Sequence, residues 1–153
     1  MTDISTGTKN SGLDAEKAAL RLAARAEQTC EGMFLKLCSR GYTREAASIA
    51  LTALVERNLV NDERFAHMWL VSRIRRTADS PRALLARLQS RGIAIKTARA
   101  ALKNVLGSEE ELDLLKRYVE KKQRGLADFD RCTREYLRAE GFSPEALEEF
   151  FNS

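Results

Sequence analysis

Residue types that usually perform catalysis or bind metals are scarce in this chain of 153 residues. It contains one histidine, His67, and three cysteines, Cys30, Cys38 and Cys132. A structural zinc site takes four such ligands at characteristic short spacings, and the sequence contains no Cys-x-x-Cys, His-x-x-x-His or Glu-x-x-His pattern. It also lacks the glycine-rich loops that cradle phosphate groups. We therefore predict no metal site, no cofactor and no enzymatic activity.

These four side chains have simpler structural interpretations. His67 lies within an apolar helical pattern without a neighbouring nucleophile, so we expect it to be partly buried and hydrogen-bonded. The three cysteines are expected to be reduced thiols in a cytoplasmic protein, and Cys30 and Cys38 are expected to be small buried apolar side chains. No stretch approaches the roughly 20 consecutive apolar residues that span a bilayer, and residues 1–12 carry no apolar secretion signal.

Cationic side chains, by contrast, are concentrated in one segment. Residues 64–103 contain ten arginines and lysines and a single acid, Asp79, so this segment carries a charge of +9 and the rest of the chain −5. A solubilising surface is one interpretation, but the self-repulsion of so much charge favours an anionic partner such as nucleic acid or a nucleoprotein. The candidate contact residues are Arg73, Arg75, Arg76, Arg82, Arg87, Lys96, Arg99 and Lys103.

Spacing brings three of these cations together. Lys96, Arg99 and Lys103 are separated by three and then four residues, which places them on one stripe of a predicted helix over 95–106. The neighbouring face of that helix suits a core. Its apolar residues are Ile95, Ala98, Leu102 and Val105.

The elements that must position these cations are predicted to be helices. Ala, Leu, Arg, Glu and Lys dominate the sequence, and apolar residues recur every three or four positions. No run of residues alternates with the period of two that a strand requires. Capping residues mark helix starts near Asn61, Ser80, Ser108 and Ser143. The sequence therefore predicts an all-α fold.

An internal repeat organises these helices. Gly41, Gly92 and Gly141 each follow a leucine by four positions and precede a bulky apolar residue by one. The flanking pairs are Leu37 and Tyr42, Leu88 and Ile93, and Leu137 and Phe142. We predict that each glycine ends a helix in the left-handed conformation and that the next residue packs under the turn.

A further helix is predicted before each turn, over 13–26, 61–76 and 108–123. The sequence thus predicts three tandem three-helix repeats after a disordered tail. The tail is placed at 1–12 and the repeats at 13–58, 59–106 and 107–153. Because units of roughly fifty residues are marginal alone, we expect them to stack into an elongated, curved molecule, with a basic second repeat and an acidic third.

Two stretches of the second repeat resemble a known family. The run from Leu59 to Ala66 (LVNDERFA), followed by Trp69 and Arg73, is similar to the signature of the RecX family. The later stretch from Leu84 to Ile93, with its Arg-Gly-Ile ending, resembles the end of the corresponding RecX helix. The likeness covers about residues 18–153 and is most specific in this central repeat.

The resemblance implies a function. RecX proteins are cytoplasmic bacterial regulators of the RecA recombinase in DNA repair and the SOS response, and they are built from tandem three-helix repeats. They bind in the groove of the RecA–single-stranded DNA filament and inhibit strand exchange, ATP hydrolysis and co-protease activity, without being enzymes. The expected partners here are thus the RecA filament and single-stranded DNA, with duplex DNA as a further candidate. We expect a monomer without membrane association.

Two other interpretations of the same residues remain open. The helix over 95–106 could be the recognition helix of a sequence-specific helix-turn-helix protein that binds duplex DNA. Alternatively, the chain could be a helical-repeat adaptor for acidic protein partners. A footprint on a defined DNA site without recombinase would favour the first interpretation, and salt-insensitive binding to a protein the second.

Overall fold

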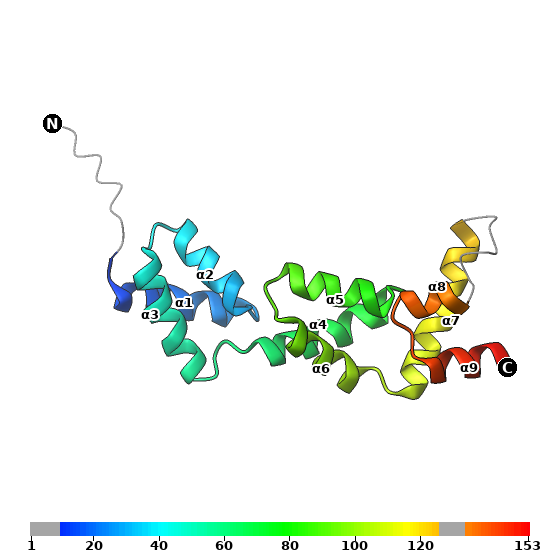
Figure 1. Cartoon of the computed structure of the whole chain (residues 1–153). Helices are drawn as coiled ribbons and strands as arrows, with labels where there is room; N and C mark the ends of the chain where they lie inside the picture. The colour runs from blue at the N-terminus through cyan, green and yellow to red at the C-terminus, as the bar shows by residue number, and fades with distance from the viewer. Residues whose placement is uncertain (1–9, 126–133) are drawn as a thin grey trace. The chain divides into compact units, whose positions relative to one another are not determined.

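The computed structural model describes residues 10–125 and 134–153, and over these ranges every regular element is an α-helix (Figure 1). The predicted all-α fold is therefore confirmed. Most of the predicted disordered tail, and Cys132, lie outside the described residues. None of the described helices combines the length and apolar character that a membrane span requires. The helices are α1 (Gly12–Arg25), α2 (Cys30–Ser39), α3 (Arg44–Glu56), α4 (Asp62–Arg76), α5 (Pro81–Ser90), α6 (Ile95–Val105), α7 (Ser108–Gly125), α8 (Arg134–Ala139) and α9 (Pro144–Asn152).

The described residues divide into two compact units. Residues up to Phe65, joined by 91–93, form unit 1, and residues 66–90 and 94–153 form unit 2. The division falls inside α4 rather than between helices. The three repeats expected from the sequence stay a prediction, because the two compact units do not follow the boundaries of those repeats.

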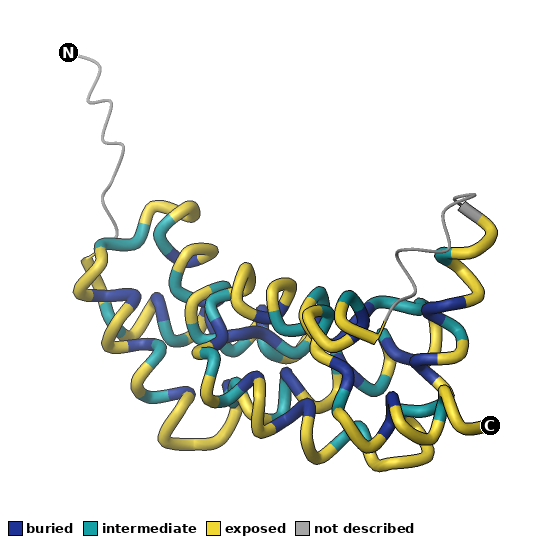
Figure 2. The backbone as a smooth tube through the Cα atoms, turned by 45° about the vertical axis from the view of Figure 1, so that its right-hand side comes forward, coloured by how far each residue is buried: buried dark blue, intermediate teal, exposed yellow. Residues whose placement is uncertain are grey.

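Unit 1 is built around the contact of α1 with α3, against which α2 also packs. Its core contains many alanines, which allow the helix backbones to approach closely. Larger buried side chains complete the core. Figure 2 shows the buried positions as dark blue segments that recur along the helices. They include Leu22, Met33, Leu37 and Leu54.

Unit 2 places α5 against α6, and α9 against both α7 and α8. The apolar face predicted for α6 is confirmed, since Ala98 and Leu102 are buried and Ile95 and Val105 are partly buried. This leaves the opposite face of α6 available to solvent. The other large buried side chains of unit 2 include Leu84, Leu88, Leu114, Leu115, Leu137 and Phe142.

The three predicted turns are confirmed by their backbone angles. Gly41, Gly92 and Gly141 have φ values of 94°, 84° and 96°, in the left-handed region that glycine adopts without steric cost. The leucine four positions before each glycine is fully buried. At the first and third turns the residue after the glycine donates its N–H to the carbonyl of that leucine, at 3.2 and 3.3 Å, which is the pattern of a helix ending in a glycine.

These glycines allow a matched stability test. An added Cβ on Gly41 would meet no atom within 4 Å, whereas one on Gly141 would lie 3.1 Å from Cβ of Pro81 and 3.2 Å from the backbone nitrogen of Arg82. We expect Gly41→Ala to lower the free energy of unfolding by about 1 kcal/mol, for the left-handed conformation alone. Gly141→Ala should cost about 2 kcal/mol, and urea denaturation measures both. Equal losses of stability in the two variants would show that Pro81 and Arg82 move away from the added Cβ at position 141 without cost.

Candidate functional site

The eight predicted contact residues all lie in unit 2, where they form three groups. One group ends α4, a second lies on α5, and the third lies on α6. The groups differ in how far the protein's own carboxylates neutralise them. In order, the groups are Arg73, Arg75 and Arg76; Arg82 and Arg87; and Lys96, Arg99 and Lys103.

Two of these arginines converge on Asp79, in the loop between α4 and α5. Nε of Arg73 lies 2.8 Å, and Nε of Arg87 lies 3.4 Å, from the same Oδ2 atom of Asp79. The Asp79 side chain is only 11% exposed, and the Arg73 guanidinium also lies over the ring of Trp69, 5.9 Å from its centroid. Because the single acid of the basic segment takes up these two cations, Arg73 and Arg87 are partly neutralised structural residues.

The Asp79 carboxyl is correspondingly acidic. Burial raises its pKa, but the hydrogen bond and charge of Arg73, with the charge of Arg87, favour the ionised form more strongly, so the pKa is lowered. Since the folded-state pKa lies below the unfolded one, the ion pairs contribute stability above the ordinary carboxyl pKa. That contribution is lost as the pH falls through the folded-state value.

Asp79→Asn should therefore change stability and binding in opposite directions. Near neutral pH we expect a loss of about 1–2 kcal/mol in the free energy of unfolding, because the guanidinium groups lose a charged acceptor. The loss should disappear in acid, where Asp79 of the wild type is protonated. Affinity for single-stranded DNA should rise, since two cations are released and one negative charge is removed. A fall in DNA affinity would mean instead that Asp79 holds the arginines in their binding geometry.

Arg82 is far more accessible. Its Nη1 atom lies 3.9 Å from Oε1 of Glu140, and its side chain is 71% exposed, so the pair is a weak surface contact. The other oxygen of Glu140 accepts a hydrogen bond of 2.8 Å from Oγ of Ser80. Ser80 in turn caps α5 by accepting from N–H of Ala83 at 3.2 Å, as predicted for this helix start. Arg82 thus projects into solvent from a fixed helix start.

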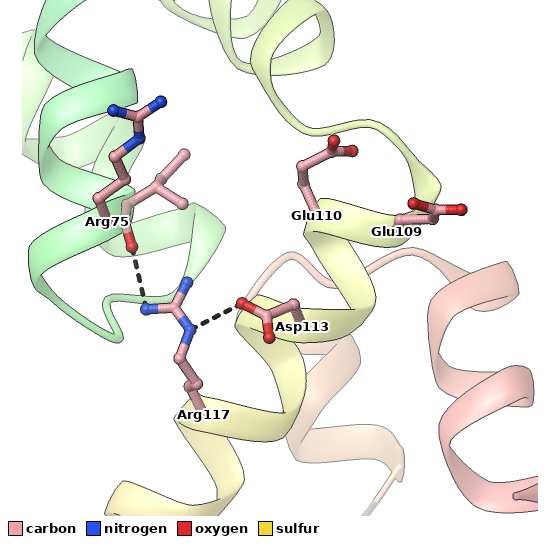
Figure 3. A pocket seen from close by; sticks show the side chains of 6 residues that line it. Arg75, Glu109, Glu110, Asp113 and Arg117 are labelled. Carbon is pink, nitrogen blue, oxygen red and sulfur yellow. Dashed lines mark hydrogen bonds and ion pairs between the residues drawn. The ribbon is translucent and has the colours of Figure 1, made fainter.

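Arg75 lies across a hollow from several carboxylates. A hollow of about 590 Å³ separates it on α4 from the carboxylates at the start of α7 (Figure 3). Because those carboxylates repel phosphate, we expect Arg75 to be a poorer candidate for a nucleic-acid contact than its exposure suggests. We call this the α4–α7 hollow. Its lining residues are Ile74, Arg75, Glu109, Glu110, Asp113 and Arg117.

Arg117 holds the end of α4 in place. Its Nη1 atom donates to the carbonyl oxygen of Ile74 at 2.9 Å, and its Nε atom pairs with Asp113 at 2.9 Å (Figure 3). Nη1 also donates to the carbonyl oxygen of Thr77 at 3.0 Å. The last carbonyls of a helix have no partner within it, so a guanidinium there satisfies them and offsets the negative end of the dipole. Sequence reasoning missed this residue because the carbonyls it binds lie about 40 positions earlier in the chain.

The third group keeps its charge unpaired. Lys96, Arg99 and Lys103 are exposed along α6, and none forms an ion pair with a carboxylate in the described ranges. α6 has no acid in its first turn, and the buried side of the helix fixes which way these three point. We call them the α6 row. It is the part of the predicted site that is least neutralised by the protein itself.

Two other residues singled out in the sequence, Arg64 and His67, do not belong to the cationic groups. Arg64, which contributes to the +9 segment, is bound within unit 1 by Glu27 at 2.9 Å and by the carbonyl of Asn58. The prediction that His67 is partly buried is wrong. His67 is exposed because the buried stripe of α4 runs through Ala66 and Leu70, and His67, the residue after Ala66, lies to one side of that stripe.

The two described cysteines do not indicate reactivity. Cys30 and Cys38 are free thiols that are partly buried, whereas we expected buried side chains. Burial, together with the nearby charge of Asp62, raises the pKa of Cys30 to about 11, so its thiol is protonated at neutral pH. Within the described ranges no group of three or more His, Cys, Asp or Glu side chains could hold a metal ion.

Each left-handed glycine joins two helices, and a further helix precedes each pair. This arrangement defines a class of proteins built from small three-helix domains. Residues 61–102 match one such domain, the second three-helix domain of RecX. The chain belongs to the RecX family of regulatory proteins, as its sequence indicated, because relatives of that name are 32% identical to it over most of its length.

That similarity extends over nearly the whole chain. Regulatory protein RecX of Treponema pallidum is 32% identical over 135 residues, which cover 88% of this chain and 73% of that protein. Regulatory protein RecX of Syntrophotalea carbinolica is also 32% identical, with 91% of this chain and 95% of that protein covered.

Solved structures share the fold. A crystal structure of regulatory protein RecX superposes with a TM-score of 0.76 at 19% identity, covering 93% of this chain and 72% of that one. The crystal structure of RecX from Lactobacillus salivarius gives 0.70 at 18% identity, with 92% and 94% covered. The family fold is therefore retained here although about four-fifths of the aligned residues differ.

Proposed function

We propose that this protein is a non-enzymatic cytoplasmic regulator that binds the RecA–single-stranded DNA filament and inhibits strand exchange, ATP hydrolysis and co-protease activity. Membership of a family of regulatory proteins supports a regulatory role. The RecX resemblance supplies the partner, and the uneven charge of the chain supports a polyanionic one. Occupation of the filament groove would obstruct both incoming duplex DNA and repressor substrates.

The observation that carries this proposal is the α6 row. Three exposed cations on one helix, none of them ion-paired with a carboxylate of the described residues, can contact successive phosphates. Arg82 extends this surface, because its neighbour Pro81 lines the same small hollow as Arg99 and Lys103. Arg76 adds an exposed charge at the end of α4, where its Nε atom donates to the carbonyl of Ser72. The α6 row is the primary contact in this proposal, and Arg73, Arg75 and Arg87 are secondary.

Co-sedimentation with RecA–single-stranded DNA filaments across a salt series, with ATP hydrolysis measured in parallel, tests the proposal. Three phosphate contacts predict a slope of about −2 for the logarithm of the association constant against that of salt, or roughly a 20-fold loss between 50 and 200 mM. Absence of binding, or unchanged ATP hydrolysis at saturation, would contradict it. Protection of a defined duplex site without RecA would instead support a sequence-specific DNA-binding protein.

A further inference from the structure

A second, smaller hollow lies directly beside the α6 row. Its volume is about 230 Å³, and it lies in unit 2 between α6, the start of α5 and the turn before α9. Pro81, Leu102 and Leu106 give it apolar walls, while Arg99 and Lys103 line its edge. Leu102 on α6 and Leu106, the residue that follows this helix, form an apolar side of the hollow, and Arg99 and Lys103, one helical turn apart, form a cationic side. We call this the α6 hollow.

The walls of the α6 hollow are held by hydrogen bonds. The backbone N–H of Arg82 donates to the carbonyl of Glu140 at 2.9 Å, which joins the start of α5 to the turn at Gly141. That glycine is close-packed, since an added Cβ would lie 3.1 Å from Pro81. The hollow is thus largely formed before any ligand arrives, as binding sites for small groups usually are.

The one acid that lines the α6 hollow is already engaged. Glu111 accepts hydrogen bonds from the backbone N–H and from Oγ of Ser143, at 2.7 and 2.9 Å, at the start of α9. The helix N-terminus offsets its negative charge. The net charge at the edge of the hollow therefore comes from Arg99 and Lys103, which favours a ligand that joins an anionic group to an apolar one.

We propose that the α6 hollow receives one unstacked base of single-stranded DNA, while Arg99 and Lys103 bind the adjoining phosphates. This inference rests on the proposed function and adds a base contact to it. A nucleotide has the required chemistry, because a flat base with apolar faces is joined through one sugar to an anionic phosphate. Apolar walls and a cationic edge are the parts from which sequence-tolerant single-strand sites are built. With the Glu111 carboxylate engaged, the hollow should accept any of the four bases.

The experiment compares two oligonucleotides of equal length and charge. One carries thymine throughout, and the other has abasic residues at every position, so both offer the same phosphates. Fluorescence anisotropy with the full chain should show about 5-fold tighter binding of the thymine oligonucleotide, at the lower end of the range for a base contact because the walls are not aromatic. In Leu106→Gln the two affinities should become equal, at the wild-type value for the abasic strand.

A matched variant separates this effect from general damage. Leu85→Gln makes the same change at another partly buried leucine of unit 2, on α5 and outside the hollow, and should keep the 5-fold preference. Circular dichroism checks that both variants remain folded. A preference that survives in Leu106→Gln, or that Leu85→Gln also removes, would overturn the proposal.

Two further outcomes separate this inference from the function on which it rests. Equal binding of both strands by the wild type would overturn the base contact and leave phosphate binding intact. Binding of neither strand would remove direct DNA contact from the proposed function as well. If the wild type shows no base preference and Leu106→Gln loses only filament binding, the hollow receives a protein side chain and the proposal is wrong.

Discussion

Reversal of Arg99 and Lys103 to glutamate should weaken binding to the RecA–single-stranded DNA filament by about 100-fold at low salt. Two attractive contacts become repulsive, and like charges facing each other in an interface cost several kcal/mol. The magnitude of the salt slope should fall from about 2 to below 1, because only Lys96 of the α6 row keeps its charge. Both side chains are exposed, so the melting temperature should hardly change. Co-sedimentation and anisotropy across a salt series measure these quantities.

The matched control changes the same charge elsewhere. Lys17 and Arg21 are four residues apart on α1, are exposed, and have no ion pair with a carboxylate in the described part of the chain. Reversal of these two residues alters the net charge equally but should reduce affinity only a few-fold, through the long-range field. Equal losses in the two double variants would show that net charge, rather than the α6 row, determines binding.

Arg117→Ala should lower the stability of the protein more than the loss of an ordinary surface arginine. The substitution removes two charge-assisted hydrogen bonds to the last carbonyls of α4 and the ion pair with Asp113. We expect a loss of about 2–3 kcal/mol in the free energy of unfolding, with a fall in melting temperature of about 5–10 °C. Affinity for single-stranded DNA should change little, because Arg117 does not belong to the α6 row.

Arg124→Ala provides the comparison within α7. Arg124 pairs with Glu120 one turn earlier, and both side chains are largely exposed, so its loss should lower the free energy of unfolding by no more than about 0.5 kcal/mol. Thermal melts of both variants suffice for the test. If Arg117→Ala and Arg124→Ala had similar effects, the contacts of Arg117 with α4 would contribute nothing beyond an ordinary helix-surface pair.

Local signals in the sequence predicted most of the helices. The expected helix over 61–76 is observed as α4 (Asp62–Arg76), and the expected one over 95–106 as α6 (Ile95–Val105). Apolar spacing, capping side chains and glycine act within one or two turns of a helix, so their effects can be read from neighbouring residues. The left-handed glycines were predictable for the same reason.

The charge of the site was also visible in the sequence, but its neutralisation was not. Ten cations against one acid identified the basic segment, yet the convergence of Arg73 and Arg87 on Asp79 depends on how the α4–α5 loop folds back. The exposure of His67 was predicted wrongly because a helix with residues of mixed polarity leaves the position of its buried stripe uncertain by one residue.

The sequence by itself determined the helical fold class, the glycine-ended turns, the family and the location of excess positive charge, since each depends on composition or on residues close together in the chain. Only the tertiary structure decided which cations remain free, that Arg117 binds the end of α4, and that a hollow lies beside Arg99 and Lys103. The contacts of Arg117 with α4 and the hydrogen bond from Arg82 to Glu140 join residues 40 or more positions apart, and helix packing creates them. The pairing of Arg73 and Arg87 with Asp79 depends instead on the path of the α4–α5 loop, which local patterns do not specify either.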